Sequence, residues 1–465
     1  MWRASVWIPT GFAALVVGLA TVGCAPPPAL HDRPLIEPSG VDVPDARVVE
    51  AVSQQFARTA PPPTDIPQWP ALFGPNRTSV TDARLNPVWP TDGPEPVWEV
   101  PVGTGYGSPV AAAGGVVFNS RVGDREIVQC HEIADGRMRW QYSYPTSAIC
   151  DFEYSDGPYS TPIIDPDQRR VFNVGGQGQF SCLDLDTGDV LWKRDLHADY
   201  DVQADIFPVG ASPLFDRDSR HPGGQLIFNL GAFHRDAGVV SLDPATGKTL
   251  WQATDQGASY GTPFVATIQG LRYAFVLTDE GLVSLDPDRG VSDWFYPFRR
   301  KGDLSRNATS PLVFGDRVLV VSAGLGAVCL KILPDRSYVE LWRQRRTIDS
   351  QYNTLILGDG HLYAFTSGGQ GGAEFRCIDL GNGAVAWNYH SVLRRGMGLA
   401  TQNAILLLGE RGHLASLAFN PEAPQVLSFT EQPLMREPCY CSPAIHGTKL
   451  ILKDESRVAV FDLGN

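Results

Sequence analysis

A sequence unit that ends in tryptophan recurs along most of the chain. The closing tryptophans are spaced by about 42 to 59 residues, the length of one blade in propeller repeats. Because the spacing is regular, the 465 residues are better explained by one repeat array than by three independent domains. We predict that all seven of these tryptophans are structural: Trp98, Trp140, Trp192, Trp251, Trp294, Trp342 and Trp387.

Most units carry a second landmark about ten residues before the tryptophan. A small residue, an aliphatic residue and an acid occur there, as in Cys-Leu-Asp at 182–184 and Ser-Leu-Asp at 241–243. A turn with glycine follows, at 186–188 and 245–247 in these two units. Glycine adopts positive φ and the acid bonds backbone amides, so this pattern predicts a tight hairpin before the last strand of each unit.

A Ser/Thr-Pro pair opens most units, and proline suits the first residue of a strand. The pairs are at 108–109, 161–162, 212–213, 262–263, 310–311 and 442–443, with Thr354-Leu355 as a variant. With the degenerate unit near 397–429, which lacks a tryptophan, the count is eight. The last unit ends after three strands, so residues 97–100 are expected to supply its fourth strand and close the ring. We predict an all-β, eight-bladed propeller of four-stranded blades over residues 68–465.

The first 67 residues have the composition of a targeting segment and a tether. Residues 1–24 combine Arg3, an apolar run and small residues before Cys24, a layout typical of a lipoprotein-type secretory signal in which Cys24 is lipidated. Cleavage after Ala25 and an uncleaved anchor are the alternatives. Residues 25–67 are rich in proline and predict an extended tether, with a candidate short helix after Asp45. We therefore expect an exported protein anchored by lipid.

The net charge of the chain limits the classes of partner that it can bind. The formal net charge is −13 and the pI is about 5.1. Binding to nucleic acid needs a surplus of Lys and Arg to neutralise phosphates. Nucleic acid is therefore excluded as the general partner.

Three motifs carry a resemblance to a known family. They are Gly-Tyr-Gly-Ser-Pro-Val at 105–110, Cys-Leu-Asp-Leu-Asp-Thr-Gly-Asp-Val-Leu-Trp at 182–192 and Trp-Pro-Ala-Leu-Phe-Gly-Pro-Asn-Arg at 69–77. The chain resembles the bacterial PQQ-like β-propeller repeat proteins, the group that includes the BamB-type lipoproteins of outer-membrane β-barrel assembly. The resemblance implies that each repeated tryptophan docks on the neighbouring blade. It also implies a monomeric, non-catalytic scaffold on the periplasmic side of the outer membrane, with envelope proteins such as barrel-assembly components as partners.

The same family includes quinone-dependent dehydrogenases, so an enzyme is the alternative function. Such enzymes are similar in fold but have adjacent cysteines, a calcium site and an aspartate base, whereas Cys439 and Cys441 are separated by Tyr440. The glycine-rich stretches 175–178 and 368–371 lack the Lys-Ser/Thr of a phosphate loop and favour hairpin turns. We predict no catalytic residues, no metal and no cofactor. PQQ with calcium in an alcohol or sugar oxidoreductase, and a ligand-sensing propeller, are the alternatives.

Cysteine usage points to packing rather than to a disulfide framework. Without Cys24 seven cysteines remain, an odd number. Four occupy the small-residue slot of the repeat: Cys130, Cys182, Cys329 and Cys377. The other three, Cys150, Cys439 and Cys441, are in predicted loops, where one pair is a candidate for oxidation in the envelope.

Tyrosine recurs two residues before the Ser/Thr of five units. Because repeats share their geometry, these tyrosines are expected to form a partial ring at one channel mouth: Tyr106, Tyr159, Tyr260, Tyr352 and Tyr440. Two interpretations are open. The ring is an aromatic rim for a peptide or a small ligand, or each tyrosine packs between blades with its hydroxyl bonded.

Charges in the loops between units are uneven. Early loops carry acids, namely Asp151, Glu153, Asp156, Asp195, Asp199, Asp201 and Asp205. Later loops carry bases, namely Arg299, Arg300, Lys301, Arg306, Arg343, Arg345, Arg346, Arg394 and Arg395. Opposed potentials orient partners, so the arginines are candidates for partner docking; solvated loop charge is the alternative.

Overall fold

The computed structural model describes residues 52–55, 66–150, 152–203, 208–300, 307–353, 355–358, 360–366 and 372–464. The predicted signal segment with Cys24 lies outside these residues, as does most of the tether. The described part of the tether includes strand β1 (Val52–Gln55), where the sequence suggested a helix. It pairs with the outer strand of the first blade, so the prediction of a helix was wrong for these four residues. No helix in the described ranges is long and apolar enough to cross a membrane.

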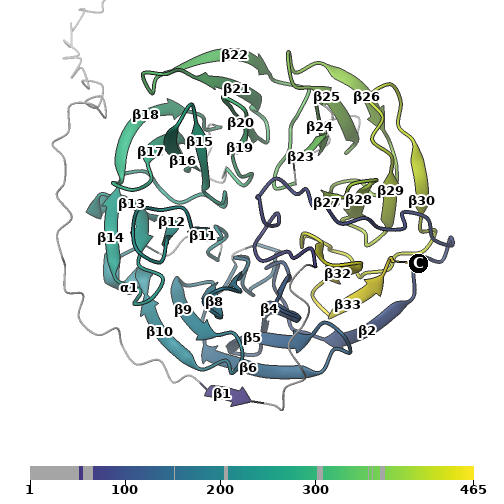
Figure 1. Cartoon of the computed structure of the whole chain (residues 1–465), viewed down its shortest axis with the longest axis horizontal. Helices are drawn as coiled ribbons and strands as arrows, with labels where there is room; N and C mark the ends of the chain where they lie inside the picture. The colour runs from purple at the N-terminus through teal and green to yellow at the C-terminus, as the bar shows by residue number, and fades with distance from the viewer. Residues whose placement is uncertain are drawn as a thin grey trace, which may run out of the picture.

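The described residues form eight antiparallel sheets arranged as blades around one axis (Figure 1). Blade 1 contains β3 (Val110–Ala112), β4 (Gly115–Val122), β5 (Arg125–Glu132) and β6 (Met138–Pro145), with β1 added outside. Blade 2 contains β7 (Ile163–Asp165), β8 (Arg170–Val174), β9 (Gln179–Asp184) and β10 (Val190–Asp195). Blade 3 contains β11 (Leu214–Asp216), β12 (Gln225–Ala232), β13 (Ala237–Leu242) and β14 (Thr249–Ala253). Blade 4 contains β15 (Phe264–Ile268), β16 (Leu271–Leu277), β17 (Gly281–Asp286) and β18 (Val291–Pro297).

The remaining blades follow the same order from the channel outward. Blade 5 contains β19 (Leu312–Phe314), β20 (Arg317–Ser322), β21 (Gly326–Ile332) and β22 (Tyr338–Gln344). Blade 6 contains β23 (Leu355–Gly358), β24 (His361–Phe365), β25 (Phe375–Asp379) and β26 (Val385–Tyr389). Blade 7 contains β27 (Gly396–Ala400), β28 (Ile405–Gly409), β29 (Leu414–Leu417) and β30 (Val426–Phe429). Blade 8 contains β31 (Ala444–His446), β32 (Lys449–Lys453), β33 (Arg457–Asp462) and, from the front of the chain, β2 (Pro96–Pro101).

The ring closes through strand β2. It pairs with β33, with Trp98 opposite Val460 and Val100 opposite Val458. This pairing confirms the prediction that residues 97–100 complete the last blade. Closure leaves no unpaired edge at the joint between the two ends of the propeller.

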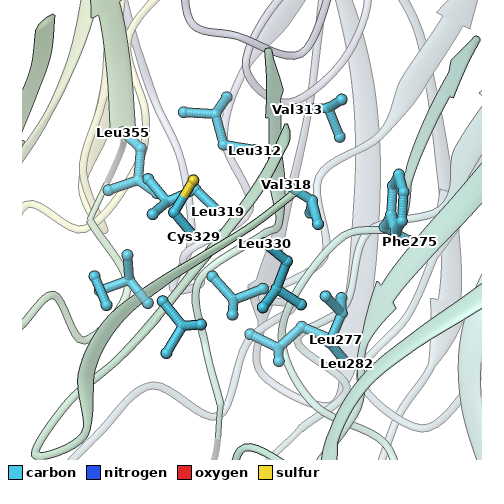
Figure 2. Close-up of a cluster of buried hydrophobic side chains, with 14 of the residues drawn as sticks. Phe275, Leu277, Leu282, Leu312, Val313, Val318, Leu319, Cys329, Leu330 and Leu355 are labelled. Carbon is cyan, nitrogen blue, oxygen red and sulfur yellow. The ribbon is translucent and has the colours of Figure 1, made fainter. Parts of the chain in front are cut away.

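The hydrophobic core lies between neighbouring blades. Around blade 5, for example, Phe275 and Leu282 of blade 4 face Val318 and Leu330, and Leu355 of blade 6 belongs to the same buried cluster (Figure 2). The second and third strands of the blades are buried on both faces. Their sequences are therefore nearly continuous runs of apolar residues. Outer strands are more exposed: β10 has no buried residue, and β22 and β26 each bury only their tryptophan.

Each repeated tryptophan joins its blade to the next one. The indole N–H donates to a backbone carbonyl of the following blade at 2.7–3.2 Å. The bonds run from Trp98 to Ile133, Trp140 to Leu185, Trp192 to Pro244, Trp251 to Pro287, Trp294 to Arg336, Trp342 to Leu380 and Trp387 to Asn420. Because each bond crosses a blade interface, the tryptophans couple the ring into one unit.

The hairpin glycine makes room for the indole. At Gly188 the φ angle is +74°, and an added Cβ would be 2.7 Å from the ring of Trp140. Any side chain there would be strained and would collide with the indole. The glycine and the tryptophan of the preceding unit therefore form one interlocking pair.

Blade 7 obtains its tryptophan from another part of the chain. Ser428 stands opposite Ser416, in the register where blade 6 has Trp387 opposite Cys377. The Ser428 hydroxyl accepts from the amide of Trp89 at 2.9 Å and donates to its carbonyl at 3.3 Å. The Trp89 side chain is buried among residues of blades 7 and 8. A tryptophan from outside the repeat thus fills the gap in the repeat.

The segment of residues 66–95, called the leader below, crosses the middle of the ring (Figure 1). It pairs through Trp69 with Ala111 and through Val80 with Ala400, both on innermost strands. These contacts lie beside the turns between first and second strands, which define the lower face. The upper face carries the loops between blades and the turns between second and third strands.

Candidate functional site on the upper face

A ring of hydroxyl groups supports the upper mouth of the channel. The Ser/Thr that opens one blade bonds the amide of the equivalent residue in the preceding blade. Thr161 Oγ1 accepts from Ser108 N at 3.0 Å, and Ser212 Oγ from Thr161 N at 2.8 Å. The same bond links Thr262 N to Ser310 Oγ and Ser442 N to Ser108 Oγ. The residues after each hydroxyl enter the innermost strand, so this ring fixes where the interblade loops start.

The five predicted tyrosines lie in one continuous arc above this ring. Ring centroids are 6.5 Å apart for Tyr260 and Tyr159, 4.8 Å for Tyr159 and Tyr106, 5.1 Å for Tyr106 and Tyr440, and 5.0 Å for Tyr440 and Tyr352. The contacts are tilted or edge-on, the arrangements that aromatic pairs prefer. The side chains are half-buried. They pack on one another along the mouth while keeping part of each ring accessible.

Burial keeps the arc neutral, and Ser155 bonds two of its hydroxyls. Tyr159 donates to Ser155 O at 2.8 Å, and the Tyr106 hydroxyl accepts from Ser155 N at 3.1 Å. Burial is the main cause of raised pKa values for Tyr106, Tyr159, Tyr352 and Tyr440. The arc is therefore a surface of uncharged phenols at physiological pH.

Arg395 closes one end of the arc. Its guanidinium is 5.5 Å from the Tyr352 ring centroid and 6.0 Å from that of Tyr440. Its Nε donates to Glu410 at 2.8 Å and its Nη1 to Gln351 at 2.9 Å. Arg395 is thus held by cation–π contacts and by a carboxylate, and belongs to the wall of the mouth.

The loop between β6 and β7 lies beside the tyrosine arc and exposes apolar side chains. Ile149, Phe152 and Tyr154 are all exposed on it. Ser155 of the same loop bonds the hydroxyls of Tyr106 and Tyr159, which places the loop against the tyrosine arc. Ile149, Phe152 and Tyr154 were not among the site residues predicted from the sequence. The sequence signal that could have identified them is the presence of three large apolar residues within six positions of a loop that contains Gly and Ser.

The predicted basic residues separate into three groups. Arg343 turns to the outer rim, where it pairs with Glu340 at 3.0 Å and contacts the Tyr296 hydroxyl. Arg299 pairs with Asp279 at 3.2 Å, while Arg394 and Arg395 converge on Glu410. In the described part of the chain, the exposed Arg300, Arg345 and Arg346 have no ion pair. Lys301 and Arg306 lie outside that part.

The predicted acidic residues are largely used in local structure. Asp195 caps helix α1 (Leu196–Tyr200), Asp199 pairs with Arg194 at 2.8 Å, and Asp201 ends the helix with φ of 54°. Asp156 accepts from the Cys150 amide at 2.7 Å. Glu153 is exposed, and Asp151 and Asp205 lie outside the described residues. Asp156, Asp195 and Asp199 are therefore bonded to nearby backbone amides or to an arginine.

The seven cysteines in the described ranges are all buried free thiols. Cys130, Cys182, Cys329 and Cys377 stand directly opposite the tryptophans of their own blades. Cys441 donates to the Tyr106 carbonyl at 3.4 Å and Cys439 to the Arg436 carbonyl at 3.5 Å. The suggested disulfide among Cys150, Cys439 and Cys441 is not formed, since each thiol is packed separately.

A calcium-bound quinone would need a cluster of metal ligands at the mouth. Calcium needs several carboxylate or amide oxygens at one point. No group of three or more His, Cys, Asp or Glu in the described ranges could hold a metal ion. The stretch 175–178 forms the hairpin turn between β8 and β9, as predicted, with Gly178 N donating to Gly175 O. The matching stretch 368–371 lies outside the described residues.

Solved structures with a similar fold include both binding proteins and enzymes. BamB from Moraxella catarrhalis is 14% identical with a TM-score of 0.57, over 80% of this chain and 100% of that one. A europium-containing methanol dehydrogenase is 12% identical with a TM-score of 0.64, over 85% and 98%. Quinohemoprotein alcohol dehydrogenase from Comamonas testosteroni is 12% identical with a TM-score of 0.53, over 86% and 81%. At such identities the likeness shows the fold alone.

A family model matches the chain at the level of sequence. No curated protein matches the chain. Residues 155–389, half of the chain, match the model described as outer membrane protein assembly factor BamB. This range covers blades 2 to 6, including the hairpin and tryptophan motifs that define the repeat. The chain therefore belongs to the BamB family of PQQ-repeat β-propellers.

Proposed function

We propose that this chain is a non-catalytic scaffold of the cell envelope that binds a partner protein with its upper face. Membership of the BamB family is consistent with the cell envelope and with envelope protein partners. The observation that carries the proposal is the β6–β7 loop, which exposes Ile149, Phe152 and Tyr154 and bonds the tyrosine arc through Ser155. Apolar side chains gathered on an exposed loop mark protein contact surfaces.

The positions of exposed arginines also support binding by the upper face. Arg345 and Arg346 are exposed in the loop between blades 5 and 6, on the upper face, and Arg300 lies beside Gly324 of blade 5. Arginine is enriched at protein interfaces and exposed charges steer association. The proposed docking surface therefore combines an apolar centre at the β6–β7 loop with an arginine-bearing flank, and by family analogy its partners include β-barrel assembly components.

Photocrosslinking in intact cells tests this surface. A photoreactive residue at Phe152 is expected to capture a discrete envelope protein, because this side chain is 39% exposed at the proposed centre. Val426 has the same exposure of 39% but lies on the outer strand β30, and provides the control position. Equal capture from both positions, or none from Phe152, would contradict the proposal.

Charge reversal gives an independent test of the flank. The variant Arg345→Glu/Arg346→Glu is expected to lower the crosslinking yield at Phe152 by about tenfold. Arg84→Glu/Arg289→Glu makes the same charge change at exposed positions of the lower face and should leave the yield unchanged. Arg343 is unsuitable for this test because its reversal would disrupt the rim pair with Glu340.

We also propose that Cys24 is lipidated and tethers the propeller to the periplasmic face of the outer membrane. The signal-like residues 1–24 and the proline-rich spacer support this proposal. Cells fed labelled palmitate are expected to label the wild-type chain, and Cys24→Ala should lose the label and leave the membrane fraction. A labelled Cys24→Ala chain would refute lipidation at this residue.

A further inference from the structure

A large cavity opens on the upper face between blades 2, 3 and 4, beside the β6–β7 loop, whose Ile149 also belongs to the lining. Its volume is about 1080 Å³, which exceeds that of a typical small-molecule site. The walls come from the β8–β9 turn, helix α1, strand β12, the segment 255–260 and the β16–β17 turn. The cavity therefore lies where several interblade loops meet.

The cavity lining is strongly acidic. Among its described residues there is no Lys or Arg, but there are five carboxylates: Asp195, Asp201, Asp255, Asp279 and Glu280. Asp279 already binds one guanidinium from outside the lining, that of Arg299. Asp195 accepts from Ala198 N at 3.0 Å and Glu280 from Gly257 N at 2.9 Å, so backbone bonds hold these carboxylates in place.

Buried acceptors without donors provide an independent sign of a ligand. Asn229 is 1% exposed and lines the cavity. Its Nδ2 donates to Ser259 Oγ at 3.1 Å and to Leu277 O at 3.4 Å, which sets the orientation of the amide. Within the described part of the chain its Oδ1 has no partner, and neither has Oε1 of Gln179 on the opposite wall. Both groups are acceptors, so the missing partner is a hydrogen-bond donor.

Apolar surface separates the polar groups of the lining. Phe228 and Phe233 of blade 3 line the cavity, as do Tyr260 and Ile149. A ligand matched to these walls carries several cationic N–H donors joined by hydrocarbon. Linear polyamines have this composition, whereas a bare metal ion would leave the apolar walls without contact.

We propose that this cavity binds a small linear organic oligocation of the polyamine class. Ammonium groups pair with Asp201 and Glu280 and donate to Asn229 Oδ1, while the methylene segments pack on the aromatic walls. Lysine and arginine side chains of a peptide present the same chemistry. This inference goes beyond the scaffold function and does not depend on it.

Calorimetric titration of the untethered mature chain with spermidine tests the proposal. One-to-one saturable binding with a dissociation constant in the micromolar range is expected. The double variant Asp201→Asn/Glu280→Gln should weaken binding about tenfold, because two ion pairs are lost. Asparagine tolerates the positive φ at position 201, and the glutamine that replaces Glu280 retains an acceptor for the Gly257 amide, so the variant is expected to fold.

The control variant makes the same charge change elsewhere. Asp82→Asn/Glu95→Gln alters two exposed acids of the leader and should change the affinity less than twofold. Equal weakening in both double variants, magnesium binding as tight as spermidine binding, or no heat at millimolar spermidine would overturn the proposal. A lysine-rich peptide that binds more tightly than spermidine, and loses affinity only in the cavity variant, would support the site and identify a polypeptide as the source of the cation. The titration uses the isolated chain, so its outcome is separate from that of partner crosslinking.

Discussion

Replacing Trp140 with Ala is expected to lower the free energy of unfolding by about 3–5 kcal/mol. The side chain is fully buried, and its indole donates to the Leu185 carbonyl of blade 2 at 2.8 Å. The change opens a cavity beside Gly188 and leaves that carbonyl without its indole partner. Equilibrium urea denaturation followed by far-ultraviolet circular dichroism measures the effect.

One further variant separates burial from hydrogen bonding at Trp140, and a second provides a control at an exposed residue. Trp140→Phe keeps most of the apolar contact and loses the N–H donor, so an intermediate loss is expected. Leu191→Ala shortens an exposed residue of the outer strand of blade 2 and should cost less than about 1 kcal/mol. A loss below about 1 kcal/mol for Trp140→Ala would show that the blade interface does not depend on the docked indole.

Removing Glu132 is expected to destabilise the chain by a similar amount, about 3–5 kcal/mol. Glu132 and Arg139 are 5% and 3% exposed, and Oε2 and Nη2 are 2.6 Å apart. In Glu132→Leu the guanidinium stays buried and keeps its longer bonds to the Ala113 carbonyl, at 3.4 and 3.5 Å, but loses its counter-ion. A buried charge without its counter-ion is costly, and denaturant unfolding reports the loss.

The double variant Glu132→Leu/Arg139→Met provides the decisive comparison. It removes both charges and should recover most of the stability, because the desolvation cost disappears with them. Glu99→Leu removes the acid of an exposed pair with Arg457 and should change stability by less than about 1 kcal/mol. If the double variant is no more stable than Glu132→Leu, the loss comes from packing and not from the buried charge.

Repeated motifs allowed part of the candidate site to be predicted. Tyr106, Tyr159 and Tyr440 stand two residues before the opening Ser/Thr of their units, and equivalent positions in a closed ring must be neighbours. The same reasoning fails for residues in loops of unequal length. Arg343 was predicted in a loop, yet it lies in strand β22 and pairs with Glu340 at the rim. The orientation of such a side chain depends on the residues near it, and these differ from one repeat to the next.

The sequence by itself determined the eight-bladed ring, its closure by residues 97–100 and the positions of the interblade tryptophans. These follow from local patterns, because strand alternation, hairpin turns and the Gly–Trp contact recur in each unit. Only the tertiary structure decided that Trp89 fills the gap in blade 7, that the β6–β7 loop lies against the tyrosine arc and that five carboxylates meet at one cavity. These features join segments far apart in the chain, and their free energy comes from burial and charge in a shared space that exists only after the ring has closed.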